Sequence, residues 1–278
     1  MDITFSIFPK FYKHLSVDEL ASLVREVGLD ATNLVIRDGY WVQPDSLAKD
    51  VPAFVKAMDS AGIEVRFATA GFSAGEIIHD EEPLKILADN GIADFRMGYF
   101  RGGDKQPAEA LAEARAQMCQ VASVCERVGI RAVYQVHHGT HIVGPTAAYQ
   151  LLKGLPSEYV GVMLDPGNQA FEGFEKWSRS AALLGQQLVA IGVKDVAWVR
   201  DESQAAEPHK GWQLQWATLD EGITNWYDLV TALKANFFNG TFVWMPFYDE
   251  DDPDQMTCKL KHEVAYLRKV VADVEAEG

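Results

Sequence analysis

Hydrophobic positions along the chain follow two patterns, short β-branched runs and longer amphipathic segments. Four times an amphipathic segment ends at a glycine that is followed directly by a β-prone run, at Gly28, Gly62, Gly91 and Gly129. A glycine suits the left-handed turn that ends a helix before a strand. The pattern therefore predicts repeated βα units, whose parallel strands need helical crossovers.

Eight runs have the length and composition of buried strands. They cover residues 3–8, 32–36, 64–69, 93–98, 132–136, 160–164, 188–193 and 241–246. Interleaved with helices and free of Pro- or Ser-rich linkers, they predict an α/β protein with one (β/α)8 TIM barrel as a single domain, 1–278. An open doubly wound sheet is the alternative. It is disfavoured because no Gly-x-Gly-x-x-Gly motif follows the first strand.

Helix signals are clear at three places along the chain. Ser16 and Glu19 form the capping box of a first helix, and apolar spacing predicts a helix over 111–128 and a last one from about His262. The stretch 198–226 interrupts the repeat and is expected to be irregular. Its tryptophans are expected to form a lid or an apolar wall over the barrel mouth.

Net charge and cysteine content limit the kinds of partner and the compartment that the sequence predicts. The chain has 25 basic and 40 acidic residues, a net charge of −15, which disfavours nucleic acid and anionic membranes as partners. It shows no basic region followed by an apolar run at its start, and no apolar stretch near the ~20 residues that span a bilayer. Its three cysteines lack metal-ligand spacing, and we expect free thiols in a reducing cytoplasm.

Polar residues gather where predicted strands end, which in α/β barrels is where sites form. The run 130–136 is apolar and then meets His137, His138 and His141. Alternation along a strand puts Gln135 and His137 on one face, so His137 is favoured over His138. A loop that happens to hold histidines is the alternative interpretation.

Two further strand ends carry charge. Asp165 follows the apolar run 160–164 and could ligate a metal, act as a base or cap the next helix. Lys194 could act in the site or form an ion pair with Asp195 at the rim. Arg37 and Arg101 could anchor a carboxylate or phosphate. We take His137, Asp165 and Lys194 as candidate catalytic residues. The candidate substrate-binding residues are Arg37, Tyr99, Arg101, Gln135, His138, Asn168, Trp212, Trp216 and Trp244.

Taken in order, these features resemble the xylose isomerase-like barrel superfamily of sugar and sugar-phosphate isomerases and epimerases. The matching segments are Gln-Val-His-His-Gly at 135–139, Asp-Pro-Gly-Asn at 165–168, Val-Lys-Asp at 193–195 and Asp-Glu-Gly-Ile-Thr-Asn-Trp at 220–226. The resemblance covers nearly the whole chain. It implies a barrel and a small-molecule carbohydrate partner.

The resemblance also implies where a metal site departs from the family pattern. Such families hold a metal with Glu on strand five, Asp on strand six, His on strand seven and Glu on strand eight. The matching positions here are Gln135, Asp165, Gly192 and Met245 or Pro246. We therefore predict no metal ligands of the usual kind and no cofactor. A divalent ion (Mn, Mg, Zn or Co) would need a non-standard ligand set.

The leading hypothesis is a cytoplasmic carbohydrate isomerase- or epimerase-like enzyme for a small sugar, keto-sugar or sugar acid. It would abstract a proton next to a carbonyl, with His137 or Asp165 as base, because Gln135 cannot titrate. A lyase reaction is left open. The alternative is an inactive barrel that binds a sugar or stabilises a partner subunit, and a homo-oligomer is also left open. An abasic-site endonuclease of the same superfamily is disfavoured by the −15 charge.

Overall fold

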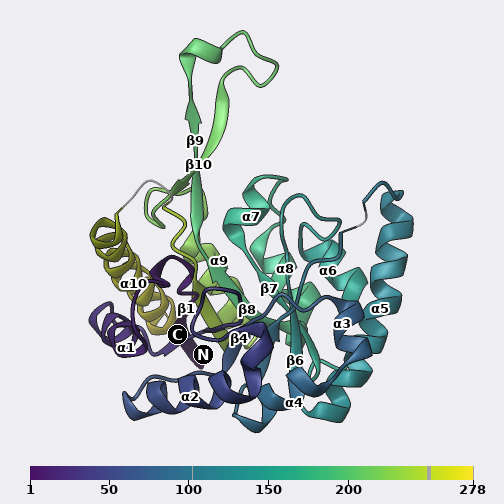
Figure 1. The fold of residues 1–278 in the computed structure, drawn as a ribbon. Coiled ribbons are helices and arrows are strands. Elements are labelled where there is room, and N and C mark those ends of the chain that lie inside the picture. The colour runs from purple at the N-terminus through teal and green to yellow at the C-terminus, as the bar shows by residue number, and fades with distance from the viewer. Residues whose placement is uncertain (102, 249–251, 278) are drawn as a thin grey trace.

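Parallel strands close around a central axis in the computed structural model, which describes residues 1–101, 103–248 and 252–277 (Figure 1). The barrel strands are β1 Ile3–Ile7, β2 Ala31–Thr32, β3 Leu34–Val35, β4 Phe67–Thr69, β5 Asp94–Arg96, β6 Arg131–Gln135, β7 Val160–Leu164, β8 Leu188–Val193 and β11 Gly240–Trp244. They lie in the order β2-β1-β11-β8-β7-β6-β5-β4-β3. The first and last strands pair in parallel, from Ile3 with Gly240 to Ile7 with Trp244. The predicted barrel is confirmed.

The second barrel position is split between β2 and β3. Asn33 separates them, and β2 pairs with β1 while β3 pairs with β4. The Asn33 side chain is fully buried; its Oδ1 accepts a hydrogen bond from Ser6 Oγ (2.8 Å), and its Nδ2 donates one to Thr69 Oγ1 (3.1 Å). One polar side chain thus joins three neighbouring strands inside the barrel. The predicted continuous strand 32–36 was wrong at this residue.

Helices cover the outside of the barrel. They are α1 Val17–Glu26, α2 Leu47–Ser60, α3 Ala74–His79, α4 Glu82–Asp89, α5 Pro107–Val128, α6 Pro145–Leu152, α7 Pro166–Ala170, α8 Trp177–Leu184, α9 Trp226–Ala235 and α10 Pro253–Ala276. Short 3-10 turns cover Lys10–Tyr12, Pro44–Ser46, Gly185–Gln187 and Glu202–Gln204. Among the described residues, none of these helices is long and apolar enough to cross a membrane.

The predicted helix ends are partly confirmed. Ser16 and Glu19 form the capping box of α1. The four glycines of the sequence repeat all have positive φ, between 73° and 81°. The last helix starts earlier than predicted, at Pro253 instead of about His262, because the Asp252 side chain caps it by accepting from the backbone N–H groups of Asp254 and Gln255.

Two layers of apolar side chains show which residues face the mouth of the barrel. A large outer layer lies between strands and helices and includes Phe5, Phe242 and Trp244. A small inner layer, which includes Val133, Met163, Val189, Ala190 and Val243, fills the barrel. Because inward-pointing residues alternate along each strand, residues two positions beyond this inner layer face the mouth. Gln135 is one of them, two residues after Val133.

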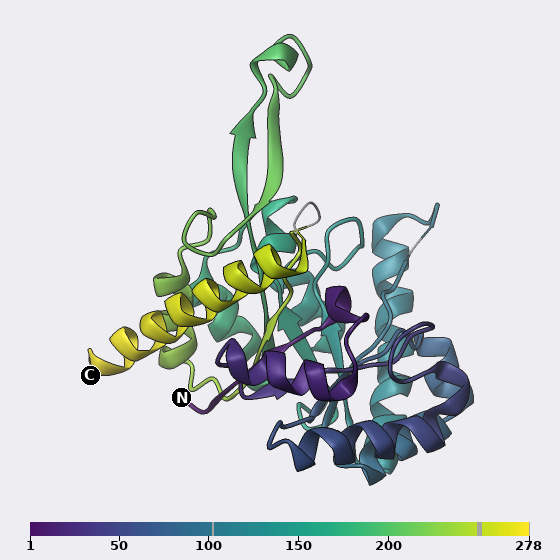
Figure 2. The ribbon, with the colours of Figure 1, turned by 60° about the vertical axis from the view of Figure 1, so that its left-hand side comes forward.

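The stretch 198–226 is not irregular, and that expectation was wrong. Strands β9 Asp195–Arg200 and β10 Trp212–Ala217 pair antiparallel, with Trp198 opposite Leu214 and Val196 opposite Trp216. Figures 1 and 2 show this hairpin rising away from the barrel instead of folding over it. Apolar residues on both strands stabilise the hairpin through cross-strand pairs. The connection between the strands is long, so the sequence lacks the short turn motif by which hairpins are usually predicted.

Candidate active site

Three neighbouring strands end in polar side chains that meet at the barrel mouth. Gln135 ends β6, Asp165 follows β7 and Lys194 follows β8. The Asp165 Oδ2 atom accepts a hydrogen bond from Gln135 Nε2 (2.6 Å) and lies 3.3 Å from Lys194 Nζ. All three side chains are buried. The structure therefore brings together the candidate residues that the sequence placed on separate strands.

The Asp165 carboxylate has two tasks. Its Oδ1 accepts from the backbone N–H of Asn168 (2.9 Å), which caps α7. Its Oδ2 accepts from Asn168 Nδ2 (2.8 Å) besides the contacts to Gln135 and Lys194. The helix-capping interpretation and the site interpretation both hold, because each oxygen serves one of them.

The Lys194 ammonium group lies under an aromatic cover. It donates to Asn168 Oδ1 (3.0 Å) and lies 4.9 Å and 4.7 Å from the ring centres of Trp216 and Phe247. Burial lowers the pKa of Lys194, and the nearby Asp165 opposes that shift. A lysine held this way can present an N–H donor, or a proton, to a substrate oxygen.

Lys194 and Asp195 do not form the rim ion pair considered from the sequence. Asp195 accepts hydrogen bonds from Thr224 Oγ1 (2.9 Å) and Trp226 Nε1 (2.9 Å), while Lys194 faces Asp165. Adjacent residues on an extended chain point to opposite sides, so only Lys194 reaches the mouth. Trp226 is thereby a buried structural residue, and it is not part of a lid.

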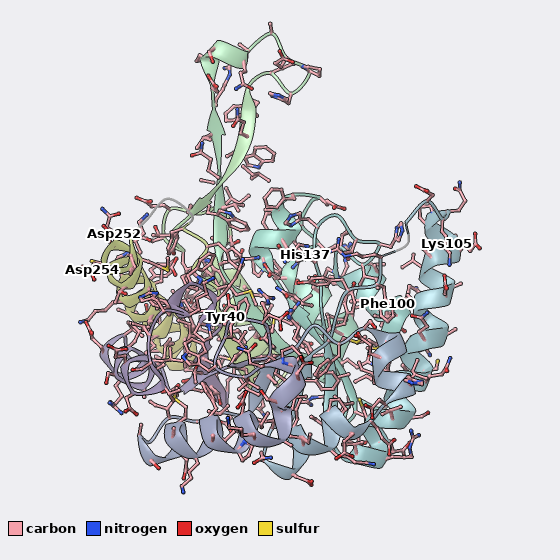
Figure 3. The ribbon with its side chains drawn as sticks, viewed as in Figure 1. Tyr40, Phe100, Lys105, His137, Asp252 and Asp254 are labelled. Carbon is pink, nitrogen blue, oxygen red and sulfur yellow. The ribbon has the colours of Figure 1, made fainter. Side chains whose placement is uncertain are left out.

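His137 and His138 stack at the edge of this cluster, with ring centres 4.4 Å apart. Figure 3 places His137 on the side of the barrel from which the hairpin rises. His137 Nδ1 lies 2.7 Å from the backbone oxygen of His138. Because that oxygen can only accept, Nδ1 carries the proton and Nε2 keeps a free lone pair. Burial lowers the pKa of His137 below 6.5, and the Lys194 charge lowers it further.

Because β6 ends at Gln135, the alternation that separated the two histidines no longer applies beyond it. His138 Nδ1 lies 3.0 Å from Asn168 Oδ1, and its ring stacks on Phe171 at 4.3 Å. His138 therefore also borders the cluster. The His137 ring contacts both His138 and Tyr99, whose ring centre lies 4.7 Å from that of His137.

Tyr99 connects the cluster to β5. Its hydroxyl donates to Gln135 Oε1 (2.8 Å), and burial raises the pKa of Tyr99, so the hydroxyl keeps its proton. The Arg96 guanidinium lies 5.1 Å from the centre of the Tyr99 ring. The sequence did not point to Arg96, because the strand was predicted to run to residue 98. The candidate residues Tyr99 and Arg101 follow that predicted end. The signal was an arginine inside an apolar strand.

Several predicted binding residues lie elsewhere. Trp244 is fully buried in the outer layer, where it packs 5.5 Å from Phe5, so its placement in the pocket was wrong. Trp212 lies on the hairpin, 46% exposed, beside Arg200. Arg37 is exposed and contacts the Tyr40 ring. Arg101 is also exposed. Of the tryptophans proposed for the mouth, Trp216 lies there.

The residues present do not fit the family's metal site. Around Asp165, the Gln135 amide donates a hydrogen bond, and the Sδ atom of Met245 lies 3.4 Å from that amide. A side chain built at Gly192 would point at Asp165, with its Cβ 3.0 Å from Oδ2. The position therefore faces the site but supplies no ligand. Within the described ranges, no group of three His, Cys, Asp or Glu side chains could hold a metal ion.

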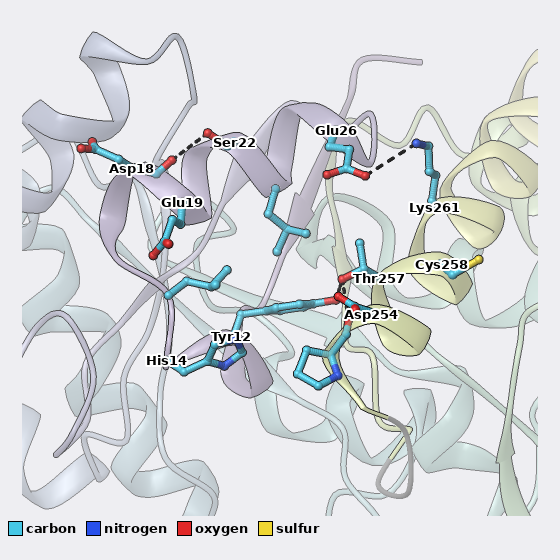
Figure 4. Close-up of a pocket in the computed structure, with 13 residues that line it drawn as sticks. Tyr12, His14, Asp18, Glu19, Ser22, Glu26, Asp254, Thr257, Cys258 and Lys261 are labelled. Carbon is cyan, nitrogen blue, oxygen red and sulfur yellow. Dashed lines mark hydrogen bonds and ion pairs between the residues drawn. The ribbon is translucent and has the colours of Figure 1, made fainter.

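A separate groove of about 690 Å³ lies between α1 and α10 (Figure 4). Two pairs of its polar side chains contact each other. Tyr12 OH contacts Thr257 Oγ1 (3.1 Å), and Lys261 lies 3.8 Å from Glu26. The groove lies outside the barrel, so we do not take it as the active site.

Comparison with known proteins identifies the family. The family model of the xylose isomerase-like TIM barrel matches residues 21–270, and the chain belongs to this family. The predicted resemblance is confirmed. No curated protein matches the chain significantly.

Solved structures share the fold at low sequence identity. A D-psicose 3-epimerase has a TM-score of 0.68 at 14% identity, over 96% of this chain and 99% of that one. A 3-keto-D-glucoside 4-epimerase from E. coli has 0.66 at 15%, over 97% and 99%. A mannonate dehydratase from Streptococcus suis has 0.71 at 10%, over 100% and 96%. At these identities the likeness shows the fold alone.

Proposed function

We propose that the protein is a carbohydrate isomerase or epimerase that moves a proton next to the carbonyl group of a small sugar, keto-sugar or sugar acid. The observation that supports this most is the meeting of Lys194, Asp165 and Gln135 beside a neutral His137 at the barrel mouth. Epimerases and a dehydratase of similar fold act on sugars and a sugar acid, as their names state. The site here would work without the family's metal ligands.

Each residue has a role in this proposal. His137 Nε2 takes the proton from the carbon next to the carbonyl, and the C–H electron pair moves into an enolate. Lys194 donates a hydrogen bond to the enolate oxygen, where negative charge develops. Asp165 holds Lys194 in place. In isomerisation, His137 returns the proton to the former carbonyl carbon, while Lys194 gives a proton to the enolate oxygen and takes the proton of the neighbouring hydroxyl group, which restores the enzyme. In epimerisation, the enolate turns over in the mouth before His137 returns the proton to its other face.

Solvent exchange tests the proposal directly. In D₂O, the protein should replace the hydrogen next to the carbonyl of D-fructose, 2-keto-D-gluconate or D-fructose 6-phosphate, as followed by proton NMR. His137→Ala should slow the exchange by about 10²-fold or more, since general base catalysis contributes at least that much. The fold should persist, because His137 lies at the mouth and outside both apolar layers.

The pH profile provides a second test. Because burial holds the pKa of His137 below 6.5, the base should already be neutral at pH 7. The exchange rate should therefore change little above pH 7.5, and the midpoint of its acid limb should lie below pH 6.5. An acid limb centred above pH 7 would contradict the assignment of His137 as base.

The alternative function is sugar binding without turnover. It is favoured by one observation: Asp165 and Lys194 satisfy each other, and Asp165 has hydrogen bonds to both oxygens. In that case the same sugars would raise the melting temperature while no hydrogen exchanges with solvent.

A further inference from the structure

Arg96 is a buried cation at the mouth. It ends β5, and 8% of its surface is exposed. Its neighbour is the Tyr99 side chain, which lies under the guanidinium. Within the described part of the chain, no carboxylate forms an ion pair with Arg96, whereas Lys194 is paired with Asp165. Burying a charge without a partner is costly, so the position calls for an anion that the protein itself does not supply.

Arg96 and Lys194 lie at the two ends of one connected arc. Tyr99 contacts Arg96, Tyr99 donates to Gln135, Gln135 donates to Asp165, and Asp165 pairs with Lys194. The arc therefore holds two buried cations and one buried carboxylate, and it carries an excess positive charge. Burial lowers the pKa of Lys194 most, and the positive charges of Arg96 and Lys10 lower it further, as nearby like charges do.

This local charge contrasts with the rest of the molecule. The chain has a net charge of −15, but salt screens exposed charges beyond a Debye length of about 8 Å at physiological ionic strength, while buried charges are screened much less. A small anion at the mouth is therefore attracted by the nearby positive charges of the arc more strongly than the screened surface charges repel it. A large polyanion is repelled by the surface before it arrives.

We propose that the substrate is an anionic keto-sugar, held by its carboxylate or phosphate group on the guanidinium of Arg96. This rests on the proposed function and names its substrate class. The fork of the guanidinium matches the two oxygens of either group. An anion fixed there, at the β5 end of the arc, leaves the carbonyl part of the sugar to lie along the arc toward Lys194, with the His137 ring beside Tyr99.

Three matched sugars test the proposal. D-Fructose, 2-keto-D-gluconate and D-fructose 6-phosphate share one stereochemistry and differ in having no anionic group, a carboxylate beside the carbonyl, or a phosphate at the far end. Binding is measured by calorimetry at low and high sodium chloride. We expect at least one anion to bind 10-fold or more tightly than D-fructose, with an affinity that falls as salt rises. Which anion binds decides between carboxylate and phosphate.

Two variants locate the effect. Arg96→Gln removes the charge and should weaken anion binding 10- to 100-fold, a loss at least 5-fold larger than any change in D-fructose binding. Arg200→Gln removes the same charge from the exposed hairpin and should leave every affinity unchanged. Arg96→Lys keeps the charge without the fork and should fall between these. Circular dichroism and urea unfolding establish that each variant is folded.

The results also separate this inference from the proposed function. Equal binding of all three sugars, anion binding unchanged in Arg96→Gln, or no anion binding at 10 mM would overturn the substrate class. If hydrogen exchange were then still observed on D-fructose, the proposed isomerase or epimerase function would be supported without the anionic substrate class. Anion binding lost in Arg96→Gln without any exchange would support the substrate class and contradict the isomerase.

Discussion

Two buried carboxylates, Asp165 and Asp195, follow the neighbouring strands β7 and β8, and their surroundings differ. Asp165 lies in the mouth cluster, defined as Gln135, Asp165, Asn168 and Lys194. Asp195 lies in the base cluster under the hairpin, defined as Asp195, Thr224, Trp226, Tyr248 and Glu263. Both carboxylates are at most 1% exposed. The mouth cluster contains a cation 3.3 Å from its carboxylate, whereas the carboxylates of the base cluster are held by neutral donors.

Burial favours the protonated form of the two carboxyl groups in the base cluster. Glu263 accepts a hydrogen bond from the backbone N–H of Leu219 (3.1 Å) and one from the Tyr248 hydroxyl. Burial raises the pKa of Glu263 to about 8, and it also raises the pKa of Asp195. Hydrogen bonds tie the loop after the hairpin to α10 through these groups. The cluster therefore serves the architecture of the hairpin base.

The comparison teaches that burial of a carboxylate does not make a site. Both clusters are buried and well hydrogen-bonded, but the mouth cluster adds a cation, a histidine with a free lone pair and an aromatic wall. The difference arises at one peptide bond, where Lys194 turns inward and Asp195 turns outward. Variants at the two aspartates should therefore have different consequences.

The largest effect is expected for Asp165→Asn. Removing one partner of a buried ion pair typically costs about 3–5 kcal/mol, because Lys194 would stay buried without a counterion. Hydrogen exchange on the substrate should fall by about 10²-fold or more, since Lys194 loses the group that positions it. Urea unfolding and NMR exchange measure the two effects. Retention of full exchange would remove Asp165 from the mechanism.

Asp195→Asn is the matched variant in the base cluster. Its new amide group would face the N–H donors of Thr224 and Trp226, and leaving buried donors unsatisfied costs about 1–3 kcal/mol each. The free energy of unfolding should fall by about 2–3 kcal/mol. Substrate affinity and exchange in the folded protein should stay within about 3-fold of wild type. A loss of exchange as large as in Asp165→Asn would erase the distinction between the clusters.

The barrel was predictable from sequence because its signals are local. Glycine at helix ends and the Ser16 capping box depend on a few neighbouring residues, and the structure confirms them. The hairpin was not predictable in the same way, because its strands are joined by the long segment 201–211 and its pairing depends on Trp198 meeting Leu214.

The candidate site shows the same limit. Gln135, Asp165 and Lys194 could be found because each closes or follows an apolar run. Arg96 and Trp244 could not be placed, because a shift of one residue in a strand's alternation moves a side chain from the barrel to the outer layer. The sequence pattern gives the strand but leaves its register to the packing of its neighbours.

The pH dependence of stability should come from the base cluster. Glu263 has a folded pKa of about 8 against an ordinary value of 4.5, so the folded protein keeps a proton that the unfolded chain releases above pH 4.5. The free energy of unfolding should therefore fall as pH rises toward 8, by up to about 1.4 kcal/mol per unit, and level off above it. Urea titrations between pH 6 and 9 measure the slope.

Glu263→Gln is the control for that slope. The glutamine cannot ionise, and its carbonyl oxygen can still accept from Leu219 and Tyr248. The variant should lose most of the fall in stability between pH 6 and 8. An unchanged slope would assign the pH dependence to other groups, with Asp195 next to be tested because burial shifts its pKa in the same direction.

The smallest effects are expected for Trp216 and Trp212. Variants at these residues distinguish two interpretations of the tryptophans, an apolar wall at the mouth and a lid formed by the hairpin. Trp216→Ala removes the ring that lies 4.9 Å from Lys194 Nζ and 5.4 Å from the Phe247 ring. A cation over an aromatic ring gains about 0.5–2 kcal/mol. Because Trp216 holds Lys194 in place, affinity for a sugar bound by Lys194 should fall by about 2- to 30-fold. Trp212→Ala lies farther out on the hairpin, half exposed. It should change the free energy of unfolding by no more than about 0.5 kcal/mol, as surface substitutions usually do, and leave the affinity for the sugar unchanged.

Calorimetry with 2-keto-D-gluconate compares the affinities of the two variants. If Trp212→Ala weakened binding as much as Trp216→Ala, the hairpin would have to fold over the mouth when the sugar binds, and the wall would have to be redrawn as a lid.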